Sequence, residues 1–291
     1  MHAVDNGNTC WAFVSDSTEA RHVYDVIHAI SVLRGKGVSK DAIRFFTDDP
    51  KAIQYTSVFD CPDPLPIQEF EQELASLKGY EYLFITLGGH GGIDGIGHPV
   101  KITTHSLVLA ARGAPDIKLA VIAVTQCFAG TFNYIDARTA PPVVMFGAAN
   151  LTTSLSTPIR LNQAINGQGF YLQQWIANSF MFYLFRWIFD PKDIDGDGQS
   201  TLLDAYKFSG SSASGEIIKV KPEIYMEAQR LADESRQLAL DITSGKVKDK
   251  LTAQLQAEGL RTELKQKVAL MHSSQEPWLL HADLARKLVI F

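Results

Sequence analysis

Cysteine is scarce in this chain, which has three cysteines among 291 residues. An odd number this small cannot build a disulfide framework, so the composition indicates a reducing compartment or one thiol with a chemical role. Long apolar runs are also missing: no stretch reaches the ~18 residues that a membrane-spanning helix needs, and the first residues lack the pattern of a signal peptide. We therefore expect a soluble protein, cytoplasmic as the sequence stands, with secretion after removal of a leader left open.

An excess of basic residues is missing as well. The chain has 27 Lys and Arg against 32 Asp and Glu, for a formal net charge of -5, and no block of basic residues. This balance predicts neither a nucleic-acid partner nor membrane insertion. The hydrophobic content of 46% is enough for a large core, while nothing in the composition indicates an oligomeric state.

What the chain does have is a series of apolar segments separated by helical patterns. Residues 20–37 place apolar side chains three and four positions apart, as an amphipathic helix does, and residues 68–77 predict a second helix. Five short apolar runs predict buried strands, at residues 10–15, 42–47, 82–87, 118–127 and 142–150. This alternation predicts an α/β fold with a mostly parallel, doubly wound sheet covered by helices on both faces, in which the first and third strands are neighbours.

The third and fourth predicted strands end in residues that can carry chemistry. The third is followed by "GGHGG", with His90 among four glycines, and the fourth ends at Cys127. The carboxyl ends of parallel strands meet at one edge of a sheet, so a thiol and an imidazole are expected there together. The imidazole can activate the thiol and protonate a leaving amine, while the N–H groups of Gly91 and Cys127 stabilise an oxyanion. An inert buried cysteine and a histidine held within its own loop are the alternatives.

Several stretches in order resemble the legumain family of the caspase-like clan of cysteine peptidases. A strand ending in His-Gly precedes a strand ending in Cys, and the family's motifs are matched by "RHVYDVIHAISVLRGKGVSKDAIRFFTDD" (21–49) and "FGAANLTTSLST" (146–157). The form "GHGG" is similar to that of the GPI-transamidase catalytic subunit, a relative in the family. The resemblance covers residues 9 to about 157. It implies a caspase-like three-layer sandwich, and we expect this catalytic domain at residues 9–190.

The resemblance also implies roles for individual residues. The positions that match the catalytic dyad and its oxyanion contributor are His90, Cys127 and Gly91. The positions that match the primary specificity pocket are Arg21, His22 and Ser154. A guanidinium at the floor of such a pocket can bind an amide oxygen or a carboxylate. No cofactor is needed for this chemistry, and a polar pair on a solvated helix face is the alternative for Arg21 and His22.

Two residues depart from the family pattern. Glu19 stands where the family usually has Asn, and Thr125, expected as a substrate-binding residue, stands where legumain has an acidic residue. Loss of that acid removes an acceptor for an Asn amide and leaves the pocket more positive. We therefore expect cleavage after both Asn and Asp.

Residues 191–210 contain a second motif, "DIDGDGQSTLLD". Carboxylates occupy its first, third, fifth and twelfth positions and glycine its sixth, as in an EF-hand loop, although its twelfth residue is Asp where a bidentate Glu is usual. The predicted Ca²⁺ ligands are Asp193, Asp195, Asp197, Gln199 and Asp204. We expect a structural calcium ion followed by a short helix; an acidic surface turn is the alternative.

The rest of the chain has a different pattern. Residues 216–270 carry apolar residues at spacings of three and four with mixed charges, which predicts a helical hairpin extension, and residues 275–291 are expected to pack on the catalytic domain. The predicted function is a cysteine endopeptidase that hydrolyses peptide or protein substrates after Asn or Asp. A peptide ligase or transamidase using the same acyl-enzyme is one alternative. A non-catalytic caspase-like scaffold that binds partners through the hairpin is the other.

Overall fold

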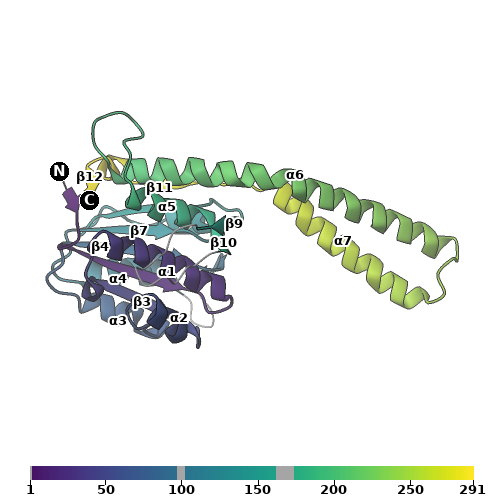
Figure 1. Cartoon of the computed structure of the whole chain (residues 1–291), viewed down its shortest axis with the longest axis horizontal. Helices are drawn as coiled ribbons and strands as arrows, with labels where there is room; N and C mark the ends of the chain where they lie inside the picture. The colour runs from purple at the N-terminus through teal and green to yellow at the C-terminus, as the bar shows by residue number, and fades with distance from the viewer. Residues whose placement is uncertain (1, 97–101, 162–173) are drawn as a thin grey trace. The chain divides into compact units, whose positions relative to one another are not determined.

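The computed structural model describes residues 2–96, 102–161 and 174–291 (Figure 1). Its contacts divide the chain into two compact units. The first unit comprises Met1–Ser214 and Gln275–Phe291, and the second comprises Gly215–Ser274. The candidate residues of the sheet edge and of the acidic loop all belong to the first unit.

A six-stranded sheet forms the centre of the first unit, with strand order β11-β8-β7-β4-β2-β3. Five strands are parallel and β11 joins the edge antiparallel to β8. The strands are β2 (Thr9–Ser15), β3 (Ile43–Thr47), β4 (Tyr82–Gly88), β7 (Leu119–Val124), β8 (Val143–Gly147) and β11 (Trp278–Leu280). The mixed α/β fold with a mostly parallel sheet is thus confirmed, and the first and third predicted strands, β2 and β4, are neighbours.

Alternate residues of each strand enter two different hydrophobic clusters. On β2, Trp11 and Phe13 pack in one cluster, and Ala12 and Val14 in the other. The first cluster includes helices α1 (Ala20–Gly35) and α5 (Ser179–Phe189), and the second includes α3 (Phe70–Ala75) and α4 (Thr104–Gly113). Full burial of a large apolar side chain contributes about 1.5 to 3 kcal/mol. This two-sided core therefore holds the carboxyl ends of the strands in place.

Smaller elements surround the sheet. Three two-stranded pairings complete the first unit: β1 (His2–Val4) with β12 (Leu288–Ile290), β5 (Gly91–Gly92) with β6 (Gly95–Ile96), and β9 (Ser156–Arg160) with β10 (Gln174–Asn178). The short helices are α2 (Ala52–Val58), α8 (Ala282–Ala285) and the 3₁₀ turns Lys40–Ala42, Ile67–Glu69 and Ala129–Asn133. The C-terminal segment thus supplies an edge strand, β11, and the partner of β1.

The second unit contains most of helix α6 (Leu202–Thr243), whose first residues belong to the first unit, and the whole of helix α7 (Lys250–His272). The short helix expected after the acidic loop is the beginning of the 42-residue helix α6. The buried residues of the second unit are Ile217, Ala228, Leu231, Ala253 and Ala257. Across the described residues, no helix is both long enough and apolar enough to cross a membrane.

Candidate active site

Strands β4 and β7 run side by side and end at the same edge of the sheet, with Leu87 paired to Val124. His90 follows β4 and Cys127 follows β7, so both lie at the carboxyl edge, where open α/β sheets bind ligands. A cavity of about 340 Å³ lies there. Among the residues expected from the sequence, it is lined by Arg21, His22, His90, Cys127 and Ser154.

The glycines around His90 allow two loops to touch. Gly89 has a φ of +123°, a conformation that L side chains rarely adopt. A Cβ atom added at Gly91 would overlap the carbonyl oxygen of Cys127 and the Cγ atom of Gln126. The absence of a side chain at Gly91 therefore lets the loop after β4 pack directly on the loop after β7.

The thiol of Cys127 interacts with the main chain of Ser154. The N–H of Ser154 donates to Sγ at 3.3 Å, and Sγ lies 3.5 Å from the carbonyl oxygen of the same residue. Burial raises the pKa of Cys127, and the Ser154 N–H opposes that shift. Within the described part of the chain, no hydrogen bond joins Sγ to His90. Catalytic hydrogen bonds often form only once substrate is bound.

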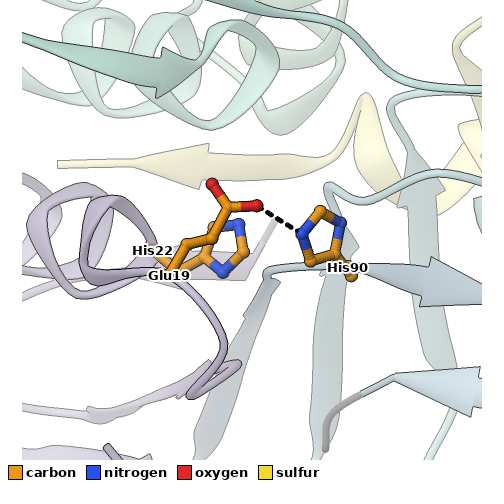
Figure 2. A group of neighbouring side chains, drawn as sticks. All are labelled: Glu19, His22 and His90. Carbon is orange, nitrogen blue, oxygen red and sulfur yellow. Dashed lines mark hydrogen bonds and ion pairs between the residues drawn. The ribbon is translucent and has the colours of Figure 1, made fainter. Parts of the chain in front are cut away.

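His90 is oriented by Glu19, the residue that precedes helix α1. Nε2 of His90 lies 2.6 Å from Oε1 of Glu19 (Figure 2). The hydrogen bond from Arg21 is the largest cause that lowers the pKa of Glu19 to about 2. An ionised carboxylate only accepts hydrogen bonds, so we assign the proton of this contact to Nε2 of His90. Nδ1 is then the nitrogen left to exchange a proton with the thiol.

Arg21 lines the cavity, and its charge is offset by Glu19. Its Nε lies 2.5 Å from Oε2 of Glu19, and its Nη1 donates to Oγ of Ser156 at 2.7 Å. The expectation of a more positive pocket, based on the missing acid at position 125, is therefore wrong. Glu19 supplies a carboxylate from a different element.

His22 forms a neutral wall beside His90. It is 2% exposed, and burial is the main cause that lowers its pKa to about 4. The two imidazole rings meet edge to face with centroids 5.0 Å apart (Figure 2). Nδ1 of His22 is 3.9 Å from Asp16, too far for a hydrogen bond. His22 therefore adds no positive charge to the cavity at neutral pH.

Thr125 does not line the cavity, contrary to its expected place in the substrate pocket. It is fully buried, because it continues the pairing of β7 with β4. Its hydroxyl donates to the carbonyl oxygen of Leu87 at 2.7 Å and accepts from Nδ2 of Asn178 at 3.1 Å. Its role is to connect the sheet to Asn178, which does line the cavity.

One wall of the cavity consists of residues that are not predicted from the sequence. Strands β9 and β10 contribute Ser156, Ile176 and Asn178, with Asn178 directly opposite Ser156 in the pairing. No catalytic residue type or long alternating pattern marks these two short strands. One local signal is present: Asn178 precedes helix α5 and its side chain accepts from the N–H of Met181, as an N-cap does.

A buried carboxyl group joins this wall to helix α1. Asp25 accepts hydrogen bonds from Nε1 of Trp175 at 2.7 Å and from the N–H of Asn178 at 3.2 Å. Burial is the main cause that raises the pKa of Asp25 to about 7. Asp25 therefore anchors β10 to α1 and titrates in the neutral range.

In the acidic loop, three of the predicted calcium ligands converge. One carboxylate oxygen from each of Asp193, Asp195 and Asp197 lies within 4.8 Å of the others, and all three residues are exposed. Asp193 accepts from the N–H of Gly196 at 2.6 Å and of Gly198 at 2.8 Å. The loop thus curls around the first carboxylate.

The other two predicted ligands are placed differently. Asp204 is fully buried and accepts from the N–H groups of Ile194, Asp195 and Thr201, so it ties the loop to the start of helix α6. Gln199 donates its N–H to Asp197 at 3.0 Å. Asp204 is therefore not part of the exposed cluster of three.

No family model matches this chain, and no curated protein sequence matches it. The cavity at the ends of β4 and β7 brings a thiol, an imidazole and a guanidinium together, and the carboxylate of Glu19 contacts the last two.

Proposed function

We propose that the protein is a cysteine endopeptidase that cleaves after Asn or Asp and has a caspase-like catalytic domain resembling the legumain family. One observation carries the proposal: His90 and Cys127 follow neighbouring parallel strands and line the same cavity. A partly buried thiol with a raised pKa needs a base close by to become a nucleophile. Of the two imidazoles that line the cavity, His90 is the exposed one.

In the proposed reaction, Nδ1 of His90 takes the thiol proton as Sγ of Cys127 attacks the scissile carbonyl carbon. The tetrahedral oxyanion binds the N–H groups of Gly91 and Cys127. The C–N bond then breaks, and His90 gives its proton to the leaving amine. Water, deprotonated by His90, finally attacks the thioester and releases the acid and the thiol.

Glu19 supports this cycle as a positioning residue. Its hydrogen bond to Nε2 holds the imidazole ring and stabilises the imidazolium that forms when Nδ1 takes a proton. The same carboxylate also accepts from Arg21, so two groups of the site are oriented by one side chain. A carboxylate performs this role with more electrostatic stabilisation than a neutral amide would.

We also propose that the acidic loop binds Ca²⁺ as a structural ion. Three carboxylates within 4.8 Å of one another provide oxygen ligands of the kind that calcium prefers. They would be Asp193, Asp195 and Asp197, with the Gln199 carbonyl as the further ligand expected from the motif. Asp204, whose two oxygens already accept main-chain hydrogen bonds, would hold the loop in place and not the ion. When bound, the ion would neutralise the repulsion among these carboxylates; it takes no part in the proposed reaction.

The test is to incubate the protein with a peptide library and identify the products by mass spectrometry. Hydrolysis after Asn and Asp supports the proposal. Products joined to a second peptide amine would show that a ligase or transamidase uses the same acyl-enzyme. No product with any peptide would leave the non-catalytic scaffold as the better description and would overturn the proposal.

A further inference from the structure

Gln126 carries a buried amide that the protein leaves unsatisfied. Neither its Oε1 nor its Nε2 has a hydrogen-bond partner among the described residues, although Gln126 is 1% exposed. Burying an amide without partners is unfavourable for folding. Gln126 lines the cavity at the sheet edge. A group that enters the cavity can therefore supply the missing partners.

The packing around Gln126 places it beside the proposed reacting groups. It directly precedes Cys127 in the chain, and its Cγ atom lies 2.2 Å from the position that a Cβ at Gly91 would take. The side chain thus contacts the loop after β4 as well as belonging to the loop after β7. A substrate side chain that enters the cavity from the scissile bond comes within reach of this amide.

The charges of the cavity indicate what kind of side chain fits. Arg21 is paired with Glu19 at 2.5 Å, and His22 is neutral near pH 7 because burial lowers its pKa to about 4. These groups together leave little net charge for a carboxylate to neutralise. A carboxylate also offers only acceptors, so it cannot satisfy Oε1 of Gln126.

We propose that Gln126 is a specificity-determining residue, whose amide pairs with the carboxamide of a substrate Asn and discriminates against Asp. The proposal rests on the endopeptidase function proposed above. Nε2 of Gln126 donates to the oxygen of the carboxamide, and Oε1 accepts from its NH₂ group. With Asp, the Oε1 acceptor stays buried and unpaired, and Glu19 repels the added charge.

The test compares the cleavage of two peptides that differ only in Asn or Asp before the scissile bond, at pH 7.5. For the unmodified protein we expect kcat/KM to favour Asn by on the order of 10 to 100-fold, the cost of leaving one buried polar group unpaired. Gln126→Met keeps the length of the side chain and removes both polar atoms, so the preference should fall towards equality. Its melting temperature should stay the same or rise, because the orphaned amide is gone.

Gln126→Glu should increase the preference for Asn over Asp, whereas Gln126→Met should reduce it. A carboxylate at this position still accepts from the NH₂ group of Asn and repels Asp, so turnover of the Asp peptide should fall further. Thr86→Val is the matched control, since the Thr86 hydroxyl is also buried and unpaired but does not line the cavity. This control should leave the Asn to Asp ratio unchanged.

The outcomes separate this inference from the proposed function. An unchanged Asn to Asp ratio in Gln126→Met, or an equal loss of both activities, would overturn the role of Gln126 while leaving the endopeptidase intact. A preference for Asp in the unmodified protein would overturn it as well. Absence of cleavage for both peptides, with unmodified and variant proteins alike, would instead count against the proposed function.

Discussion

The cavity and the acidic loop differ in how the negative charge of their carboxylates is compensated. Beside the cavity, Glu19 contacts two nitrogen groups, at 2.5 Å from Arg21 and 2.6 Å from His90. In the acidic loop, carboxylates of the same sign converge within 4.8 Å, and Lys207 lies 3.0 Å from Asp195. Beside the cavity, the carboxylate is thus paired with nitrogen groups of other side chains. In the second region, most of the negative charge remains uncompensated.

The two regions therefore gain different things from a ligand. Charges that compensate each other are ordered before a substrate arrives, so the cavity is preorganised for chemistry. Carboxylates that repel one another gain most when a cation binds among them. The first region should therefore respond to substitutions through turnover, and the second through stability.

The largest expected effect is on turnover in the cavity. Cys127→Ala removes the proposed nucleophile, and His90→Ala removes the proposed proton donor of the leaving amine; each should lower kcat by more than about 1,000-fold. Turnover is measured with an Asn peptide, and covalent labelling with an acyloxymethyl-ketone probe. Labelling that survives in Cys127→Ala and moves to Cys10 or Cys61 would contradict the choice of nucleophile. Both of these cysteines are buried, and burial raises their pKa to about 12.

The next effect concerns Asp25, whose carboxyl group is neutralised by a proton and not by a cation. Its pKa is raised from 3.8 to about 7 in the folded protein, mainly by burial. Below the pKa of Asp25 in the unfolded chain, its protonated carboxyl group makes its full contribution to stability. This contribution is lost as the pH rises towards 7. The free energy of unfolding relative to Asp25→Asn should therefore fall between pH 4 and 8, by up to ~1.4 kcal/mol per pH unit at the steepest.

Urea unfolding at a series of pH values measures this difference. Asp60→Asn, on the surface, is the control for loss of one carboxylate. Burial lowers the pKa of His22 and of His28 to about 4, so both residues make stability rise with pH in the same window. The comparison with Asp25→Asn removes their contribution. A difference that does not change with pH would show that Asp25 does not titrate here.

Much of the sheet could be predicted from the sequence because its strands are buried on both faces. Such strands give unbroken apolar runs, and the order of the motifs placed His90 and Cys127 at one edge. The wall formed by Ser156, Ile176 and Asn178 could not be predicted in this way. Its strands are short and half exposed, and their pairing depends on contacts with a distant helix.

The charge of the cavity was predicted wrongly for a related reason. The missing acid at position 125 was visible in the sequence, but the compensation by Glu19 depends on the direction of one side chain at the start of α1. The direction of the Glu19 side chain cannot be predicted from periodicity or motif spacing. The unpaired amide of Gln126 is likewise a property of packing, since its neighbours come from distant parts of the chain.

Calcium should stabilise the acidic loop. Ca²⁺ at about 100 times its dissociation constant contributes roughly 2.7 kcal/mol, which is a measurable rise in melting temperature. Asp193→Ala should abolish this rise, because Asp193 lies in the cluster and organises the loop. Asp190→Ala, an exposed acid paired with Lys192, should preserve it. An unchanged melting curve on adding calcium to chelated protein would mean that the loop is only an acidic turn.

The smallest expected effect comes from disturbing the charge balance of the cavity without removing a reacting group. Arg21→Ala deletes the partner of Glu19 and the hydrogen bond to Ser156. Loss of one charge-assisted contact with substrate, worth ~1.5 to 3 kcal/mol, should lower kcat/KM by roughly 10 to 100-fold for Asn and Asp peptides.

The Arg21→Ala variant also tests whether the balance between Arg21 and Glu19 matters for His90. The Arg21 hydrogen bond is the largest cause of the low pKa of Glu19, so that pKa should rise when the guanidinium is removed. The acidic limb of the pH–kcat profile should then move to higher pH, because Glu19 becomes protonated at a higher pH and then no longer accepts the hydrogen bond from Nε2 of His90. Arg34→Ala, on the same helix and paired with Asp60 outside the cavity, should change neither kcat/KM nor the profile. Full activity in Arg21→Ala would show that the guanidinium does not bind substrate, and an unmoved profile would show that Glu19 holds His90 without it.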